Sequence, residues 1–290
     1  MEIGVYLAPE AAATDIADFA AAAERLGFDS LWLPEHPVMP TVTATPFAGV
    51  GGDEIPEAYG RLPDPLIQLA VAAGATSRIG LATGVCLVAL RNPLILAKQV
   101  ATLDASSNGR VTLGIGAGWL REEFEILAGD FRTRWDRTVE TIRALKTLWT
   151  GTDTSYAGEF VSFPSLRCLP RPVQDPHPPL IVGGKGERAL RVAAELGDGW
   201  LPVHADVEMI DAGRARLDEL AQEAGRDPTA ISIVAFGGPA RYRSVDDLGA
   251  LEAHGVAQAV LWVTEPGARA FDQLEELGEL VRAVRSSEHA

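Results

Sequence analysis

One glycine-rich stretch has the features of a phosphate-binding turn. Gly183, Gly184 and Gly186 surround Lys185, between a short apolar run at residues 180–182 and a pattern of helical spacing. Glycine lets the backbone turn tightly and approach a ligand closely. The first N–H groups of a helix have no intrahelical partner and lie at the positive end of its dipole. We therefore expect these four residues to bind a phosphate, with an ordinary tight turn as the alternative.

A second candidate is His36, which lies in the segment Pro34-Glu35-His36-Pro37. Histidine can take up or give a proton near neutral pH, and the flanking prolines make this turn stiff. The sequence therefore offers His36 as a general acid or base. A histidine on a surface turn is the alternative interpretation.

A run of alternating glycines ends in a tryptophan at Gly116-Ala117-Gly118-Trp119, with a further glycine at Gly114. A dinucleotide-binding fingerprint would need glycine at position 119. We expect the glycines to leave space for a flat ring beside the backbone. Trp119 then covers one face of that ring or packs in the core, and the pattern does not decide between them.

The elements that position these residues alternate between strand and helix. Apolar strand patterns occupy residues 3–7, 29–33, 79–84, 111–115, 180–182, 199–201, 231–236 and 258–263. Helical patterns include residues 15–26, 65–76, 94–105, 207–224, 245–253 and 268–284. Eight strand–helix units favour an α/β fold, a closed (β/α)8 TIM barrel, over an open sheet. We predict one domain over residues 1–290.

Three segments interrupt the alternation. Residues 156–163 predict a hairpin inserted before the fifth strand, and residues 40–63 predict a long irregular loop. Long loops inside compact domains are usually functional or disordered. Apolar residues from Trp135 to Trp149 recur at helical spacing, which predicts core packing.

The active site of a TIM barrel lies at the C-terminal ends of its strands. Four stretches directly follow a predicted strand: Glu35-His36, Thr83-Gly84-Val85, Gly116 to Trp119, and Gly183 to Gly186. The fold therefore predicts that they meet at one mouth of the barrel. Cys86 lies beside the second stretch, and we interpret it as a small core residue.

The composition excludes several classes of partner. The chain has 25 basic and 40 acidic residues, a net charge of −15, which disfavours nucleic acids and anionic membranes. Its five histidines show no metal-ligand spacing, so we predict no metal. Two cysteines suggest no disulfide framework and fit a reducing cytoplasm. We find no signal-peptide pattern and no run of ~18 apolar residues that would span a membrane.

Several motifs together resemble the luciferase-like monooxygenase superfamily. They are Leu26-Gly27-Phe28-Asp29-Ser30-Leu31-Trp32 with Glu35-His36, Arg91-Asn92-Pro93, Gly114 to Trp119 with Glu122-Glu123-Phe124, and Gly183-Gly184 through Gly197-Asp198-Gly199-Trp200. The similarity runs from Met1 to near Pro202, about two thirds of the chain. It is greatest to the branch of probable oxidoreductases that use the 5-deazaflavin coenzyme F-420.

The resemblance implies a barrel with an insertion, a homodimer, and hydride transfer between F-420 and a small organic substrate. Reduced FMN with molecular oxygen, in a monooxygenase of the same fold, is one alternative. A non-catalytic deazaflavin-binding protein is another. The sequence does not name the substrate.

The resemblance also implies roles for individual residues. His36 matches the family histidine that faces the reactive side of the ring, and Gly183 and Gly184 match the phosphate-binding amides. Thr83-Gly84-Val85 matches the site of a non-prolyl cis peptide that supports the ring. Trp119 stands where some sugar-phosphate dehydrogenases of the family have a catalytic glutamate, so that acid role is not expected here. Residues after Pro202 receive no role.

Overall fold

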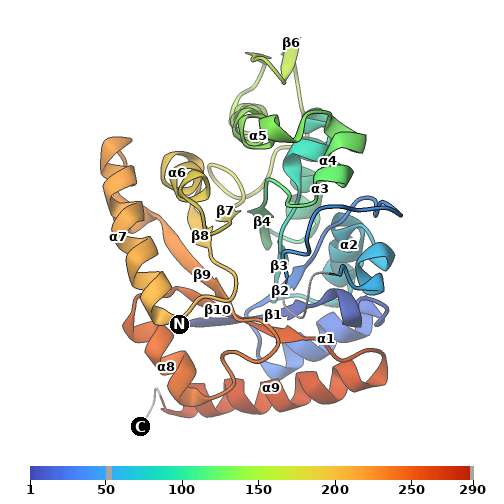
Figure 1. Cartoon of the computed structure of the whole chain (residues 1–290), viewed down its shortest axis with the longest axis vertical. Coiled ribbons are helices and arrows are strands. Elements are labelled where there is room, and N and C mark those ends of the chain that lie inside the picture. Colours follow the sequence, from blue (N-terminus) through green and yellow to red (C-terminus); the bar gives the residue numbers. More distant parts are fainter. Residues whose placement is uncertain (50–53, 288–290) are drawn as a thin grey trace.

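Eight parallel strands close into a barrel in the computed structural model, which describes residues 1–49 and 54–287. The order around the barrel is β1-β10-β9-β8-β7-β4-β3-β2 (Figure 1). The strands are β1 (Glu2–Leu7), β2 (Ser30–Leu33), β3 (Gly80–Thr83), β4 (Val111–Ile115), β7 (Leu180–Gly183), β8 (Gly199–Leu201), β9 (Ser232–Phe236) and β10 (Gln258–Val263). The predicted TIM barrel is confirmed, and the predicted strands agree with the observed ones to within about one residue.

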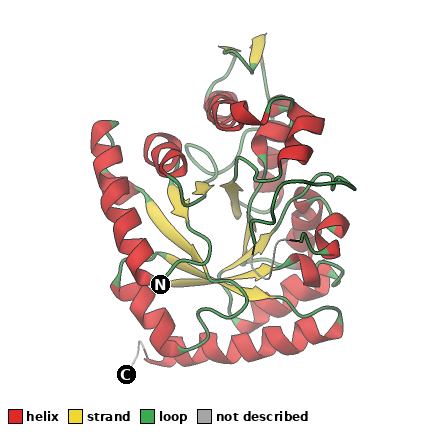
Figure 2. Ribbon diagram, viewed as in Figure 1, coloured by secondary structure: helices red, strands yellow, loops and turns green. Residues whose placement is uncertain are grey.

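Helices surround the barrel strands on the outside (Figure 2). They are α1 (Ile16–Leu26), α2 (Pro65–Ala75), α3 (Pro93–Ser106), α4 (Arg121–Ala128), α5 (Arg134–Thr150), α6 (Glu187–Leu196), α7 (Val207–Glu223), α8 (Val245–Ala253) and α9 (Ala268–Ser287). The residues at the two ends of α1 explain why the limits of this helix could be predicted from the sequence. Asp15 caps it by accepting from the N–H groups of Ala17 and Asp18, and Gly27 ends it in the left-handed conformation at φ 90°.

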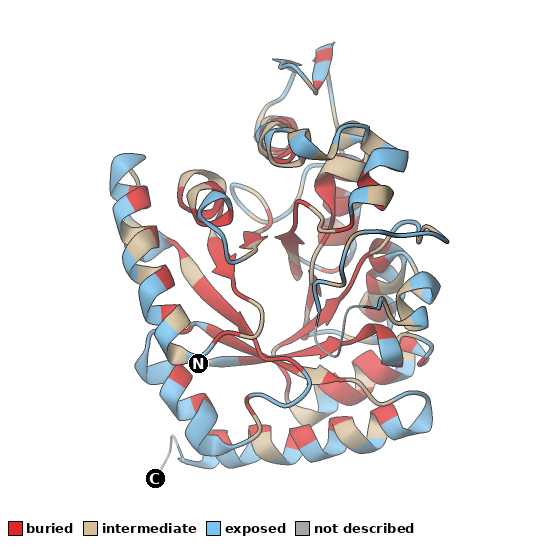
Figure 3. Cartoon of the chain, viewed as in Figure 1, coloured by how far each residue is buried: buried red, intermediate tan, exposed pale blue. Residues whose placement is uncertain are grey.

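The strands are buried on both faces, as Figure 3 shows. One apolar cluster fills the space between the strands and the helices, with Phe19, Leu69 and Leu113 among its fully buried members. A second cluster fills the inside of the barrel and includes Tyr6, Trp32 and Phe236. This inner layer forms the floor beneath the C-terminal mouth, because residues that point inward in a barrel stack in layers.

The predicted insertion is an antiparallel hairpin outside the barrel, formed by β5 (Thr154–Ala157) and β6 (Ser162–Leu166). It lies beyond α5, away from the barrel (Figure 1). Its turn is fixed to α5 because Glu140 accepts hydrogen bonds from the N–H groups of Glu159, Phe160 and Val161. The hairpin is therefore held by α5 and adds nothing to the barrel sheet.

The loop predicted at residues 40–63 is only partly irregular. It contains a short 3-10 helix, Glu57–Arg61, while residues 50–53 lie outside the described residues. The predicted core packing of the apolar residues on α5 is confirmed, with one addition at Trp135. Trp149 is buried, whereas Trp135 packs against the core and also lines a cavity.

Candidate active site

A cavity of about 600 Å³ opens at the C-terminal ends of the barrel strands. It brings together all four stretches that were predicted to converge, including His36, Gly84, Val85, Gly116, Ala117, Gly118, Trp119, Gly183, Gly184 and Lys185. Two predicted residues do not line it. Thr83 is buried and donates its hydroxyl to the Gly114 carbonyl at 2.8 Å, while Gly186 lies just before α6.

His36 is held by a buried carboxylate. Its Nδ1 lies 2.8 Å from Oε2 of Glu123, and the two side chains are 6% and 1% exposed. Because a carboxylate accepts, Nδ1 carries the proton in this contact and Nε2 is left for a ligand. The other oxygen of Glu123 accepts from the Val38 N–H at 3.3 Å. His36 is therefore an oriented imidazole, and the surface-turn alternative does not describe its surroundings.

Aromatic rings enclose His36 on the cavity side. Trp119 and Tyr59 lie 5.6 and 5.5 Å from the imidazole, measured between ring centroids. Phe47 packs against both of them, at 5.7 and 5.1 Å. Trp119 is half-buried and lines the cavity, so it belongs to the cavity wall and not to the core.

Glu35, the neighbour of His36, stabilises the structure through contacts within the protein. This buried carboxylate accepts from the Leu87 N–H at 2.6 Å and pairs with the Arg91 guanidinium, which also pairs with Asp64. The next residue, Asn92, caps α3. These contacts fix the end of β2 to the segment after β3.

A non-prolyl cis peptide joins Gly84 and Val85, the segment for which the resemblance implied one. A Cβ atom at Gly116 would lie 2.5 Å from Val85 Cγ2, so Gly116 makes room for this side chain. Gly118 has φ 81°, a conformation that favours glycine. Gly114 has a different reason from the one predicted, because its Cβ would lie 2.0 Å from the Thr83 carbonyl oxygen on the neighbouring strand.

The glycine turn after β7 is fixed from two sides. Gly184, at φ 130°, donates its N–H to the Leu201 carbonyl at 3.2 Å and accepts from Trp200 Nε1 at 2.7 Å. The N–H of Gly184 is therefore already engaged, which corrects the expectation that it serves a phosphate. No side chain caps α6, which begins at Glu187. The N–H groups available to an anion are those that follow Gly184.

Two cations line the cavity beside this turn. Lys185 belongs to it, whereas Arg134 comes from the first turn of α5. Among the described residues neither forms an ion pair with a carboxylate. Burial lowers the pKa of Arg134, and the charges of Arg121 and Arg188 lower it further. Sequence reasoning missed Arg134, because about 50 residues separate it from the turn and only the fold brings them together.

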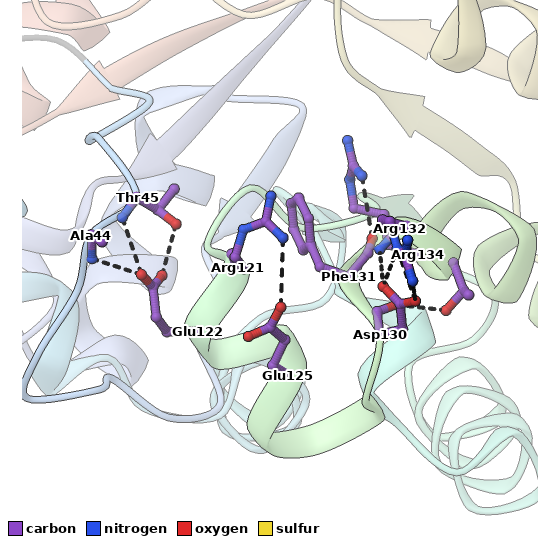
Figure 4. A network of polar contacts seen from close by, with 10 residues as sticks. Ala44, Thr45, Arg121, Glu122, Glu125, Asp130, Phe131, Arg132 and Arg134 are labelled. Carbon is purple, nitrogen blue, oxygen red and sulfur yellow. Dashed lines mark hydrogen bonds and ion pairs between the residues drawn. The ribbon is translucent and has the colours of Figure 1, made fainter.

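Polar contacts connect α4 to the loop at Ala44 and Thr45 and surround Arg134 (Figure 4). Glu122 accepts from the N–H groups of Ala44 and Thr45 and from the Thr45 hydroxyl, at 2.6, 3.1 and 2.7 Å. The bond from the Ala44 N–H is the largest cause that lowers the pKa of Glu122 to about 2. The Arg134 guanidinium lies 4.1 Å from the centroid of the Phe131 ring. Adjacent glutamates of α4 thus hold two parts of the loop after β2.

The cavity lining also contains polar groups that the sequence analysis did not select. Tyr6 and His204 both line the cavity and both contact Trp262, with ring centroids 4.6 and 5.3 Å away. Tyr6 is 5% exposed, and its hydroxyl forms no hydrogen bond within the described residues. His204 follows β8 by three residues, so the rule that selected the other stretches could also have found it.

A second cavity, of about 980 Å³, lies at the opposite end of the barrel. Two of its polar side chains already have partners within the protein: Arg110 donates to the carbonyls of Ile79 and Ala73, and Gln258 donates to Glu2. The catalytic end of a TIM barrel is the C-terminal end. We therefore place the candidate site in the cavity that contains His36.

Residues 1–49 and 54–287 contain neither a metal-binding cluster nor a membrane-spanning helix. Within these ranges no three histidine, cysteine, aspartate or glutamate side chains are grouped so that they could hold a metal ion. No helix there is both long and apolar enough to cross a membrane. Cys86 and Cys168 are free thiols, and burial raises the pKa of Cys86 well above its ordinary value.

Curated proteins with similar sequences include enzymes of two coenzyme classes. An uncharacterised protein of Mycobacterium tuberculosis is 38% identical over 72% of this chain and 74% of its own length. The F420-dependent hydroxymycolic acid dehydrogenase of the same organism is 31% identical over 79% of this chain and 60% of its own. The FMNH(2)-dependent dimethylsulfone monooxygenase of Pseudomonas putida is 32% identical over 49% of this chain and 39% of its own.

Solved structures share the fold at lower identity. The monooxygenase RslO1 of Streptomyces bottropensis superposes with a TM-score of 0.77 at 23% identity, over 98% of this chain and 99% of its own. An F420-dependent secondary alcohol dehydrogenase gives 0.75 at 18% identity, over 98% of both chains. The family model described as luciferase-like monooxygenase matches residues 1–288. The chain is a member of the luciferase-like monooxygenase family.

Proposed function

We propose that this protein is an oxidoreductase that moves a hydride between coenzyme F-420 and a small organic substrate. The observation that carries the proposal is a single cavity that holds an oriented imidazole, His36, and an anion site at the uncapped start of α6. An F420-dependent dehydrogenase among the relatives supports the choice of coenzyme.

The cavity fits a phosphorylated, flat cofactor. Its walls carry the aromatic rings of Trp119, Trp135 and Phe236, which offer flat apolar surface. Lys185 and Arg134 supply positive charge in a protein of net charge −15, and the N–H groups after Gly184 supply donors. We propose that these groups hold the phosphate and that the Gly84–Val85 peptide supports the ring.

The protein's own contribution to the reaction centres on one proton. The cofactor supplies a carbon that takes up or releases the hydride. When an alcohol is oxidised, Nε2 of His36 takes the hydroxyl proton as the hydride leaves the alcohol carbon that bears this hydroxyl. In the reverse direction Nε2–H gives that proton to the carbonyl oxygen. Glu123 holds the imidazole so that Nε2 faces the cavity, and Trp119, Phe47 and Tyr59 exclude water from it.

Reduced FMN in a monooxygenase is the second candidate function, favoured by the FMNH(2)-dependent relative. Replacing the ring nitrogen by carbon suppresses oxygen activation, so the two functions differ in oxygen use. The purified protein is therefore assayed with each reduced cofactor in an oxygen electrode and with oxidised F-420 against a panel of secondary alcohols. F-420 reduction without oxygen uptake supports the proposal, oxygen uptake with reduced FMN supports the alternative, and binding without any turnover indicates a carrier.

We further propose a homodimer. The exposed side of α2 is apolar, and no residue from Pro65 to Ala75 is charged. Ile67 and Val71 on this helix are 61% and 45% exposed, and Ile95 on the neighbouring α3 is 58% exposed. Contiguous apolar surface of this kind is typical of a protein interface. A second copy of the chain is the partner that the family resemblance implies.

A further inference from the structure

The cavity contains a second imidazole, directly across the barrel from the first. His204 follows β8 and His36 follows β2, and these strands are four positions apart in the ring of eight, the largest separation that a closed barrel allows. The backbone of His204 has φ 55°, in the left-handed region. Its N–H donates to the Phe236 carbonyl at 2.8 Å, which fixes this conformation. His204 is therefore held in place by the end of β9.

The orientation of the imidazole is fixed by the two glycines after β9. Nδ1 of His204 lies 3.1 Å from the Gly237 carbonyl oxygen. A Cβ atom at Gly238, which has φ 108°, would lie 2.2 Å from Nδ1, so this glycine provides the space for the ring. A carbonyl can only accept, so Nδ1 carries the proton and Nε2 is a hydrogen-bond acceptor.

The surroundings of this imidazole disfavour its charged form. Burial lowers the pKa of His204, and the positive charges of Lys185 and Arg241 lower it further, while the contact with the Gly237 carbonyl acts in the opposite direction. His36 instead faces the carboxylate of Glu123. Two histidines in one cavity thus have different partners, which is how one site separates a proton-transfer group from a fixed acceptor.

We propose that Nε2 of His204 accepts a hydrogen bond from a hydroxyl of the cofactor's ribityl chain. This inference rests on the proposed function, because F-420 and FMN both carry a ribityl chain between phosphate and ring. The phosphate turn follows β7, and β8 is the neighbouring strand, joined to the turn by the bond from the Gly184 N–H to the Leu201 carbonyl at 3.2 Å. A ribityl chain that runs from the phosphate at this turn into the cavity therefore starts beside the segment that carries His204.

The test uses one substitution and three probes. His204→Asn suits the left-handed backbone and keeps a short side-chain N–H for the Gly237 carbonyl, but it removes the acceptor at the Nε2 position. The probes are F-420, the ribityl deazaflavin without its phosphate, and a deazaflavin with a methyl group in place of the whole chain. Their dissociation constants are measured by fluorescence. His254→Asn, at an exposed histidine that contacts Asp211, is the matched control.

We expect His204→Asn to raise the dissociation constants of the first two probes by the same factor, about 3- to 10-fold, the range for one neutral hydrogen bond. The chain-free deazaflavin should bind the variant and the unmodified protein alike. An unchanged affinity for all three probes, or an equal loss for all three, overturns the assignment to the ribityl chain. If the unmodified protein does not bind F-420, the proposed function itself fails, and this result is distinct from the first two.

Discussion

Nδ1 of His36 and Oε2 of Glu123 lie 2.8 Å apart, although 87 residues separate them along the chain. The carboxylate comes from α4 and the imidazole from the turn after β2, so β2, β3 and β4 have to lie side by side before the pair can form. This contact orients the one side chain to which we assign proton transfer. It also gives a function to the second glutamate of the Glu122-Glu123-Phe124 motif.

Removing the imidazole of His36 should slow proton transfer while the cofactor still binds. We expect His36→Ala to lower turnover by ~10²–10⁴-fold, the usual contribution of a general acid or base, and to change cofactor affinity only a few-fold. Steady-state kinetics and a binding titration measure the two effects. Glu123→Gln should lower turnover less, and the double variant should be no slower than His36→Ala, because both residues act through one group. Unchanged turnover in His36→Ala would return this histidine to a structural role.

The phosphate site can be tested without disturbing the glycine turn. Gly184→Val is a poor probe by itself, because φ at this position is 130° and a Cβ atom would lie 2.8 Å from the Ala189 Cβ. Arg134→Gln and Lys185→Gln remove charge alone. Each should weaken F-420 binding by ~1–3 kcal/mol, the scale of a charge-assisted hydrogen bond, and leave the phosphate-free deazaflavin unaffected. Equal losses for both ligands would move the phosphate elsewhere.

The contacts of Glu122 predict a pH dependence of stability. Its pKa falls from an ordinary 4.5 to about 2 in the folded protein, because the N–H groups of Ala44 and Thr45 and the Thr45 hydroxyl favour the charged form. A lowered folded-state pKa contributes stability above the unfolded pKa, and that contribution is lost as the pH falls through the folded value.

The comparison is between the unmodified protein and Glu122→Gln in urea unfolding. The unmodified protein should be more stable near neutral pH, and the difference should shrink as the pH falls from about 4.5 to about 2. Glu125→Gln, on the same helix and paired only with Arg121 at 3.6 Å, is the matched control. A difference that stays constant over this range would mean that the charge of Glu122 does not matter to the loop.

The proposed dimer predicts a mass near twice 30.8 kDa by light scattering at micromolar concentration. Ile67→Lys together with Val71→Lys should give a monomer that unfolds at a similar temperature, because both side chains are exposed within the chain itself. A mass near 30.8 kDa for the unmodified protein would contradict the proposal.

The fold was predictable because local signals and the alternation of elements agree. Asp15 and Gly27 bound α1 as their residue types predict, and β4, β8 and β10 have the predicted limits. The lining of the candidate cavity was predictable where a residue closely follows a predicted strand, as His36 and Gly183 do. The same rule applied to β8 would have reached His204, three residues beyond Leu201.

Other parts of the site depend on contacts that no local pattern contains. Glu123 has the pattern of an ordinary polar residue at the start of a helix, and only the pairing of β2, β3 and β4 places it against His36. Arg134 lines the same cavity as the glycine turn because α5 packs against α6. We expected Gly114 to leave space for a ligand, but it makes room for the neighbouring strand β3. This requirement appears only when the register between β3 and β4 is known.

The central claim is that the cavity containing His36 and the glycine turn binds F-420 in preference to FMN. The most direct measurement is a titration of the purified protein with each oxidised cofactor, followed by quenching of cofactor fluorescence, with Arg134→Gln as a parallel sample. We predict saturable quenching of F-420 at lower concentration than FMN, and weaker binding by the variant. Tighter binding of FMN, or no saturable quenching of either cofactor, would contradict this account.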